Sequence, residues 1–210
     1  NSMFVDSCGQ ILLHNTDSLF LKTDITDLEQ ANQLGESISK SASKGVLVFE
    51  FEKIYKTFLI LAKKRYAGWK FTYSDKGWQD KIEMKGIETV RRDWCQLVTE
   101  TMNNVINIML KEGDIKKATD IVKEVLQNLN EGKIPVGKLT VVKGITKNLD
   151  AYEGTMPHVE LARKLRNRNP MDPPKVGERI SYVIVKGREL ISKRAESPEF
   201  IEKYNLPIDS

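Results

Sequence analysis

The residues with the clearest chemical potential lie in one pentapeptide near the start of the chain, His14-Asn15-Thr16-Asp17-Ser18. Apolar runs at residues 11–13 and 19–21 flank it, and each is short enough to form a β-strand. The spacing predicts a β-hairpin that carries Asp17 at its tip. An Asp in a turn commonly accepts hydrogen bonds from nearby backbone N–H groups. A carboxylate on a rigid hairpin can instead offer hard oxygen ligands to a divalent cation such as Mg²⁺.

Two cationic segments further along the chain have the composition of a phosphate-binding surface. The first is Lys63-Lys64-Arg65-Tyr66, about 45 residues after the pentapeptide, and the second spans residues 85–92. A run of cations at a strand end commonly serves as a solvated edge that resists aggregation. Clustered Lys and Arg side chains also drive the binding of nucleic-acid phosphates, so both interpretations stay open.

Charge is distributed unevenly along the chain. Residues 1–62 hold 5 Lys and 8 Asp or Glu, for a net charge of −3, whereas the remainder holds 28 Lys or Arg and 21 Asp or Glu, for a net charge of +7. An acidic end suits a cation, and a basic remainder suits a polyanion. Mixed charges also solvate an ordinary protein surface, and we expect most of these residues to do only that.

The elements that must position these residues fall into two parts. The first 88 residues predict a meandering antiparallel sheet with one helix, and from Asp93 the apolar period becomes helical. We expect residues 93–131 to be helical, with a second helix that begins at Asp114 after a turn at Gly113. The elements expected before residue 93 are a helix at 24–43 capped by Thr23 or Asp24, strands at 46–52 and 55–61, and hairpin arms at 63–73 and 79–85 around a turn at 74–77. Those expected after residue 131 are a strand at 137–143, a helix at 157–168, a strand at 179–185 and a helix at 196–204.

Composition limits the class of protein. No apolar run approaches the roughly 18 residues that span a bilayer, and we expect no signal peptide. Its two cysteines, Cys8 and Cys95, have no metal-ligand spacing and suit a reducing compartment. We therefore expect an intracellular protein, in the cytoplasm of a prokaryote or the nucleus of a eukaryote, with no membrane partner.

Five segments, in their order and at their intervals, resemble the C-terminal part of a family B DNA polymerase. Three of them are Leu-His-Asn-Thr-Asp-Ser at residues 13–18, Lys-Lys-Arg-Tyr-Ala-Gly at 63–68 and Lys-Gly-Ile-Glu-Thr-Val-Arg-Arg-Asp at 85–93; the others lie at 152–165 and 177–184. The resemblance implies an α+β fold. Residues 1–92 would form an antiparallel palm sheet with one or two helices, and residues 93–210 would form a mainly helical thumb.

The resemblance also implies chemistry at the hairpin. Where the family carries Asp-Thr-Asp-Ser, the second Asp binds metal, which assigns Asp17 as a catalytic residue and as a ligand of a two-Mg²⁺ site completed by a carboxylate outside this chain. The first Asp of that motif is Asn15 here, which offers a metal an oxygen atom but no negative charge. The motif is therefore degenerate, and weakened catalysis and an inactive paralogue both stay open.

The implied DNA contacts come from three segments. Lys63, Lys64, Arg65 and Tyr66 match family residues that approach the minor groove of the primer-template, where groove acceptors and phosphates favour correct geometry over any one sequence. Three cations match the entry to the thumb, where contacts to the DNA backbone are expected: Lys85, Arg91 and Arg92. A basic helical face has a weaker relation to DNA and comprises Arg163, Lys164, Arg166 and Arg168.

The function implied by the resemblance is a part of a DNA-directed DNA polymerase, a nucleotidyltransferase of DNA replication. The chain would act on primer-template DNA and deoxynucleoside triphosphates with Mg²⁺. It would act together with the N-terminal portion of the polymerase, in the same or a separate chain. The alternative, which Asn15 keeps open, is a catalytically inactive, polymerase-derived subunit that binds DNA or another subunit.

Overall fold

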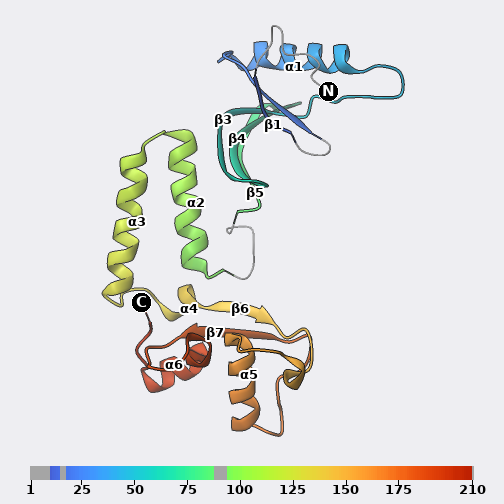
Figure 1. Cartoon of the computed structure of the whole chain (residues 1–210). Helices are drawn as coiled ribbons and strands as arrows, with labels where there is room; N and C mark the ends of the chain where they lie inside the picture. Colours follow the sequence, from blue (N-terminus) through green and yellow to red (C-terminus); the bar gives the residue numbers. More distant parts are fainter. Residues whose placement is uncertain (1–9, 15–17, 88–93, 210) are drawn as a thin grey trace. The chain divides into compact units, whose positions relative to one another are not determined.

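The structure, a computed structural model, describes residues 10–14, 18–87 and 94–209 (Figure 1). The chain divides into two compact units, residues 1–58 with 68–82 and residues 59–67 with 83–210. Helices and antiparallel sheets are both present, which confirms the α+β class in outline. Within the described ranges, no helix is long and apolar enough to cross a membrane.

The predicted hairpin at the start of the first unit is confirmed. Strands β1 (Gln10–His14) and β2 (Leu19–Lys22) pair antiparallel, with a β-bulge between Ile11 and Leu13. The hairpin forms a two-stranded sheet of its own, so the single meandering sheet expected over the first 88 residues is wrong. The tip, residues 15–17, lies outside the described residues.

Helix α1 (Leu28–Ala42) begins later than predicted. Its N-cap is Asp27, whose side chain accepts a hydrogen bond of 2.8 Å from the backbone N–H of Gln30. The predicted caps Thr23 and Asp24 are wrong, because Asp27 supplies the oxygen that satisfies the first turn and residues 23–26 have no regular structure.

A three-stranded sheet follows α1. In spatial order its strands are β3 (Ile54–Ala62), β4 (Arg65–Ser74) and β5 (Gly77–Lys85). The strand predicted at 55–61 and the hairpin around residues 74–77 are confirmed. Residues 63–64 differ from the prediction, because they form the turn between β3 and β4 and not the start of a hairpin arm.

The strand predicted at residues 46–52 is wrong. Only an isolated bridge joins Lys44 and Leu47, and residues 48–53 belong to no strand. A strand needs a neighbour that takes its backbone hydrogen bonds. Around Phe49 this role falls to hydroxyl groups of Ser39 and Ser43, so the segment is held against α1 without a ladder.

From residue 94 on, the second unit begins with two antiparallel helices. Helices α2 (Gln96–Lys111) and α3 (Ile115–Asn130) pack side by side, as the green and yellow-green ribbons of Figure 1 show. Asp114 caps α3 as predicted, by accepting a hydrogen bond of 2.9 Å from the backbone N–H of Lys117. The turn at Gly113 has a φ of 69°, a left-handed conformation that glycine adopts without steric cost.

The C-terminal part of the second unit is a small α+β layer. Its elements in chain order are α4 (Val136–Leu139), β6 (Val141–Gly144), η2 (Leu149–Ala151), α5 (Pro157–Arg168), β7 (Arg179–Ile184), η3 (Ile191–Arg194), β8 (Ala195–Glu196) and α6 (Pro198–Tyr204). The predicted strand at 137–143 is wrong in its first half, because residues 136–139 form the helical turn α4 with Pro135 as its N-cap. The helix predicted at 157–168 is confirmed. The strand predicted at 179–185 and the helix predicted at 196–204 are confirmed to within two residues.

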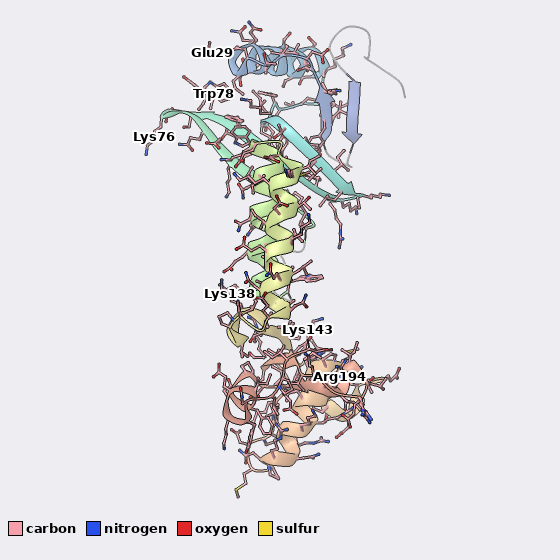
Figure 2. All side chains as sticks on the ribbon, turned by 90° about the vertical axis from the view of Figure 1, so that its left-hand side faces the viewer. Glu29, Lys76, Trp78, Lys138, Lys143 and Arg194 are labelled. Atoms are coloured by element: carbon pink, nitrogen blue, oxygen red, sulfur yellow. The ribbon has the colours of Figure 1, made fainter. Side chains whose placement is uncertain are left out.

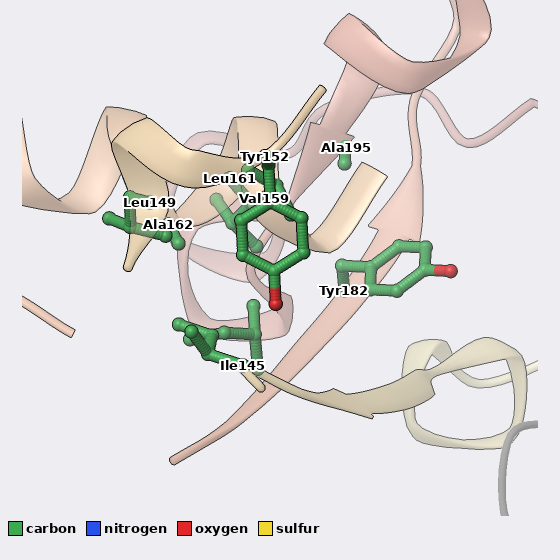
Figure 3. Close-up of a cluster of buried hydrophobic side chains, with 9 residues drawn as sticks. Ile145, Leu149, Tyr152, Val159, Leu161, Ala162, Tyr182 and Ala195 are labelled. Atoms are coloured by element: carbon green, nitrogen blue, oxygen red, sulfur yellow. The ribbon is translucent and has the colours of Figure 1, made fainter. Parts of the chain in front are cut away.

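The core of the second unit lies between α5 and the antiparallel sheet β6-β7-β8 (Figure 3). Val159 and Leu161 of α5 are fully buried there, against Ile145, Tyr152 and Tyr182. Burial of one such aliphatic side chain stabilises a fold by about 1.5–3 kcal/mol. This cluster therefore provides a stable base for the loops and helices around it.

Candidate nucleic-acid interface

The hairpin that carries the proposed metal ligands is anchored in the first unit by aromatic packing. The ring of Phe20 on β2 lies 6.0 Å from that of Tyr55 and 5.3 Å from that of Phe58, both on β3. Gly68 makes room for this cluster, because a Cβ atom there would lie 2.3 Å from the Tyr55 ring. The packing fixes one arm of the hairpin on the face of β3.

The candidate metal ligands themselves, Asn15 and Asp17, lie outside the described residues. Within the part of the chain that the structure describes, no three His, Cys, Asp or Glu side chains gather in a way that could hold a metal ion. An amide and a carboxylate oxygen are hard ligands of the kind that Mg²⁺ prefers. They fit Mg²⁺ in type, but they need further carboxylate to complete a site.

The first cationic segment forms the turn between β3 and β4. Lys63 and Lys64 are exposed, whereas Arg65 and Tyr66 are half-buried. Lys64 has a φ of 64°, in the left-handed region that costs a side-chain-bearing residue roughly 1–2 kcal/mol. A glycine would avoid this strain, so a lysine at this position is a candidate for function.

Gly86 joins this turn to the second cationic segment. Its φ is 65°, and a Cβ atom on it would lie 2.2 Å from the carbonyl oxygen of Lys64 and 3.4 Å from Cγ of Arg65. The two backbones therefore meet directly, and only glycine allows the approach. Ile87 is fully buried immediately afterwards. The sequence alone does not predict this role of Gly86, although a glycine just after a predicted strand is a signal of close backbone approach.

Lys85 lies beside this contact and is exposed. It forms an ion pair of 3.6 Å with Glu83, whose side chain is mostly buried. Because the Lys85 side chain is itself exposed, the pair leaves its ammonium group accessible. The structure thus brings Lys63, Lys64 and Lys85 to one region of the second unit. Arg91 and Arg92 lie outside the described residues.

The four cations of α5 all have partners within the second unit. Arg163 bonds Glu160 at 2.7 Å and the carbonyl of Leu149 at 3.0 Å, and Arg166 bonds Asp150 at 3.2 Å. The Asp150 pKa lies below its usual value because of hydrogen bonds from Arg166 and the charge of that residue. The basic face of the helix is thus tied to the loop before it.

Lys164 and Arg168 share one carboxylate, that of Glu196. This residue is only 7% exposed, and it accepts hydrogen bonds from Lys164 at 2.7 Å and from Arg168 at 2.9 and 3.1 Å. Burial opposes ionisation of Glu196, but the hydrogen bonds from Arg168 and Lys164 outweigh it and hold the Glu196 pKa below its usual value. The Arg168 guanidinium also stacks 3.9 Å from the centre of the Phe200 ring. Nothing in the local sequence signals this cluster.

Comparison with known proteins gives a family match over nearly the whole chain. The sequence model described as DNA polymerase family B matches residues 11–210. The chain is 40% identical over 204 residues to the DNA polymerase delta catalytic subunit of Plasmodium falciparum, with 95% of this chain and 18% of that protein covered. The same subunit of Candida albicans is 37% identical over 205 residues, with coverage of 96% and 19%. The chain therefore spans about a fifth of the length of these relatives.

A solved structure agrees with this match. The family B DNA polymerase from the hyperthermophilic archaeon Pyrobaculum calidifontis superimposes with a TM-score of 0.68 and 28% sequence identity. The alignment covers 95% of this chain and 24% of that one. Sequence and fold thus point to the same group of proteins.

Proposed function

The chain belongs to DNA polymerase family B, and on this premise we propose that it is one part of a DNA-directed DNA polymerase. Residues 1–92 would contribute to the palm and residues 93–210 would form the thumb. The part would act on primer-template DNA and deoxynucleoside triphosphates, together with the rest of the polymerase. Its own contributions would be a surface that grips DNA and one carboxylate for metal.

The observation that carries this proposal is the contact of Gly86 with the Lys64 turn. It joins two cationic segments that are separated by the whole β4–β5 hairpin. Exposed ammonium groups from both segments, those of Lys63, Lys64 and Lys85, are suited to phosphate oxygens and to groove acceptors shared by all base pairs. Such contacts fix the position of a duplex without reading its sequence.

For the chemistry, Asp17 and Asn15 would hold Mg²⁺ with a further carboxylate from outside this chain. Bound Mg²⁺ would stabilise charge on the attacking and leaving oxygens of nucleotidyl transfer. Asp17 would provide the negative charge of this chain's ligand set, and Asn15 an uncharged oxygen. The relatives are named as catalytic subunits, which does not favour the alternative of an inactive DNA-binding subunit.

The test is the salt dependence of DNA binding by this chain. Fluorescence anisotropy with a labelled recessed-end duplex between 50 and 200 mM salt should give a steep slope of log affinity against log salt, which falls by about 0.9 for each phosphate contact removed. The variant with Lys63→Ala and Lys64→Ala should therefore bind with a flatter slope.

The matched control is Lys76→Ala, in the other turn of the same sheet, at the end of the β4–β5 hairpin (Figure 2). This variant also removes an exposed ammonium group from a two-residue turn, and its slope should equal that of the parent chain. Equal slopes in the double variant and the parent would show that the Lys63 and Lys64 turn is only a solvated edge.

A further inference from the structure

The run His14-Asn15-Thr16 combines three side chains that together can break and remake the peptide bond between Asn15 and Thr16. The amide nitrogen of an asparagine side chain can attack the carbonyl carbon of its own residue, because the two groups are held close and a succinimide ring results. A threonine hydroxyl can accept an acyl group, and a histidine can donate a proton to a leaving amine. The proposed function gives no role to His14 or Thr16.

The family motif is intact from Thr16 onward and breaks immediately before it. Residues 16–18 match the Thr-Asp-Ser of Asp-Thr-Asp-Ser, whereas Asn15 stands in place of the first Asp. The family match itself begins at residue 11, so residues 1–10 lie outside it. A junction between two different segments at the Asn15–Thr16 bond explains why one metal ligand is missing while its neighbours are kept.

The two strands that lead to this bond are described, although residues 15–17 are not. β1 ends at His14 and β2 begins at Leu19, and these two residues pair across the hairpin. The bond therefore belongs to the short connection between the two strands. Ser18 and Leu19, which follow it in the chain, are both exposed. Connections of this kind are accessible to other segments and commonly carry function.

β1 can leave this hairpin without loss of the ring contacts that anchor β2. The ring of Phe20 on β2 packs on those of Tyr55 and Phe58, and β1 pairs only with β2 among the described strands. The β-bulge between Ile11 and Leu13 already interrupts the ladder that holds β1. β2 is thus fixed to the first unit by its own side chain, whereas β1 is held by a single partner strand.

We propose that the residues up to Asn15 are the C-terminal end of an intein, a segment that excises itself, and that Thr16 is the first residue of the polymerase part that follows. Excision joins an earlier part of the polymerase to Thr16. An Asp at the end of that earlier part would restore Asp-Thr-Asp-Ser and replace an amide by a carboxylate at the metal site. Excision is an activity beyond the proposed function, and it limits any metal contact of Asn15 to the chain before excision.

The chemical steps need no reagent from outside the protein. The acyl group of the earlier part first moves from its amide nitrogen to the side-chain hydroxyl or thiol of the first intein residue, and the Thr16 hydroxyl then accepts it. Asn15 Nδ2 attacks its own carbonyl carbon, the C–N bond to Thr16 breaks, and Asn15 becomes a succinimide. Nδ2 releases a proton, and the leaving nitrogen of Thr16 gains one, for which His14 is the donor. The freed amine of Thr16 attacks the ester, and the acyl group moves from oxygen to nitrogen as a peptide bond.

The test expresses the complete gene that contains this chain and maps its product by mass spectrometry after trypsin digestion. The expected peptide carries upstream polymerase sequence joined directly to Thr16 and ends at Lys22. The released segment should end at Asn15 and be lighter by one water molecule than a peptide that ends in free asparagine. A product in which Asn15 stays joined to Thr16 would overturn the proposal.

Two variants at the junction separate release from joining. Asn15→Ala removes the attacking nitrogen and should abolish the released segment. Thr16→Ala keeps that nitrogen but removes the acyl acceptor, so it should release the segment without joining the two polymerase parts. Release by Asn15→Ala, or joining by Thr16→Ala, would contradict the proposed steps. The matched control is Asn130→Ala, which changes an exposed asparagine at the end of α3 and should join as the parent does.

Primer extension by the same products keeps the two proposals distinguishable. Excision without primer extension would refute the proposed function alone. Extension by a product in which Asn15 and Thr16 stay joined would refute the excision alone. The salt slope of DNA binding should be the same in Asn15→Ala and the parent, because the cationic segments lie elsewhere in the chain.

Discussion

At the scale of single residues, Asp17 offers a metal a negative charge and Asn15 does not. Whether Asp17 alone is enough for catalysis decides between a polymerase part and an inactive subunit. When the chain is combined with the rest of a polymerase, Asp17→Ala should abolish nearly all primer extension with Mg²⁺, because the remaining carboxylate cannot hold two cations in line. Asn15→Asp should leave extension equal or raise it, since it restores a charged ligand.

DNA affinity serves as the control for both variants and should change little. Primer extension by Asp17→Ala at the parent's rate would refute the metal assignment. Extension by Asn15→Asp together with none by the parent would show that the natural protein is the inactive subunit.

Gly86 allows a prediction with a close internal control. Gly86→Ala and Gly113→Ala both place a side chain at nearly the same φ, 65° and 69°, but a Cβ atom at Gly113 meets nothing within 4 Å. Both should lose about 1–2 kcal/mol of stability through backbone strain, and Gly86→Ala should lose more because its Cβ atom would overlap the carbonyl oxygen of Lys64. Only Gly86→Ala should also displace the Lys64 turn and weaken DNA binding, measured by anisotropy at fixed salt.

Urea unfolding followed by circular dichroism measures the free energy of unfolding of each variant, and so the stability that each one loses. Equal DNA affinities of the two variants would mean that the Gly86 contact does not position the cationic turn.

At the scale of elements, capping at Asp114 is the feature most open to measurement. Asp114→Ala removes the acceptor for the Lys117 N–H and should destabilise the helical hairpin by about 1 kcal/mol. Asp120→Ala, on the exposed face of the same helix, removes only a 3.7 Å ion pair with Lys123 and should cost about 0.5 kcal/mol or less. Hydrogen exchange of the α3 amides checks both, and a larger effect at Asp120 would contradict the cap.

The elements that sequence predicted well are those whose signals are local. The cap at Asp114, the Ser197-Pro198 start of α6 and the apolar period of α2 each lie within a few residues. The strand at 46–52 failed because a strand depends on a neighbour, which its own residues do not encode. Contacts between residues distant in sequence were not predicted either, as for Glu196 with Lys164 and Arg168. For the candidate site, the resemblance to the family predicted which residues take part. The contact between the Lys64 turn and Gly86 is seen only in the structure.

At the scale of the whole molecule, the buried Glu196 carboxylate ties α5 to the C-terminal strand and predicts a pH effect. Its pKa in the folded chain lies below that in the unfolded chain, so the ion pairs stabilise the fold above the unfolded pKa of about 4.3. That stability is lost as pH falls through the folded pKa. Glu196→Gln should therefore destabilise the chain by about 1–3 kcal/mol at pH 7.

The same variant should differ less from the parent at an acidic pH than at pH 7, because protonation of Glu196 in the parent removes the charge that holds Lys164 and Arg168. Urea unfolding at both pH values measures the difference in free energy of unfolding between the variant and the parent, which is the gap that should narrow in acid. A gap that does not narrow in acid would show that the charge of Glu196 has no part in holding Lys164 and Arg168.

The close approach of Gly86 to the Lys64 turn requires the two strands of the β4–β5 hairpin to have matching lengths. Arg65 and Gly86 each lie ten residues from the turn residues Asp75 and Lys76, and residues equally distant from a two-residue turn face each other. Insertions or deletions shared equally by both arms would move only the tip, whereas a single-residue change in one arm would reverse its side-chain faces. Across a lineage, this hairpin can thus lengthen or shorten in matched steps while the two cationic segments stay together.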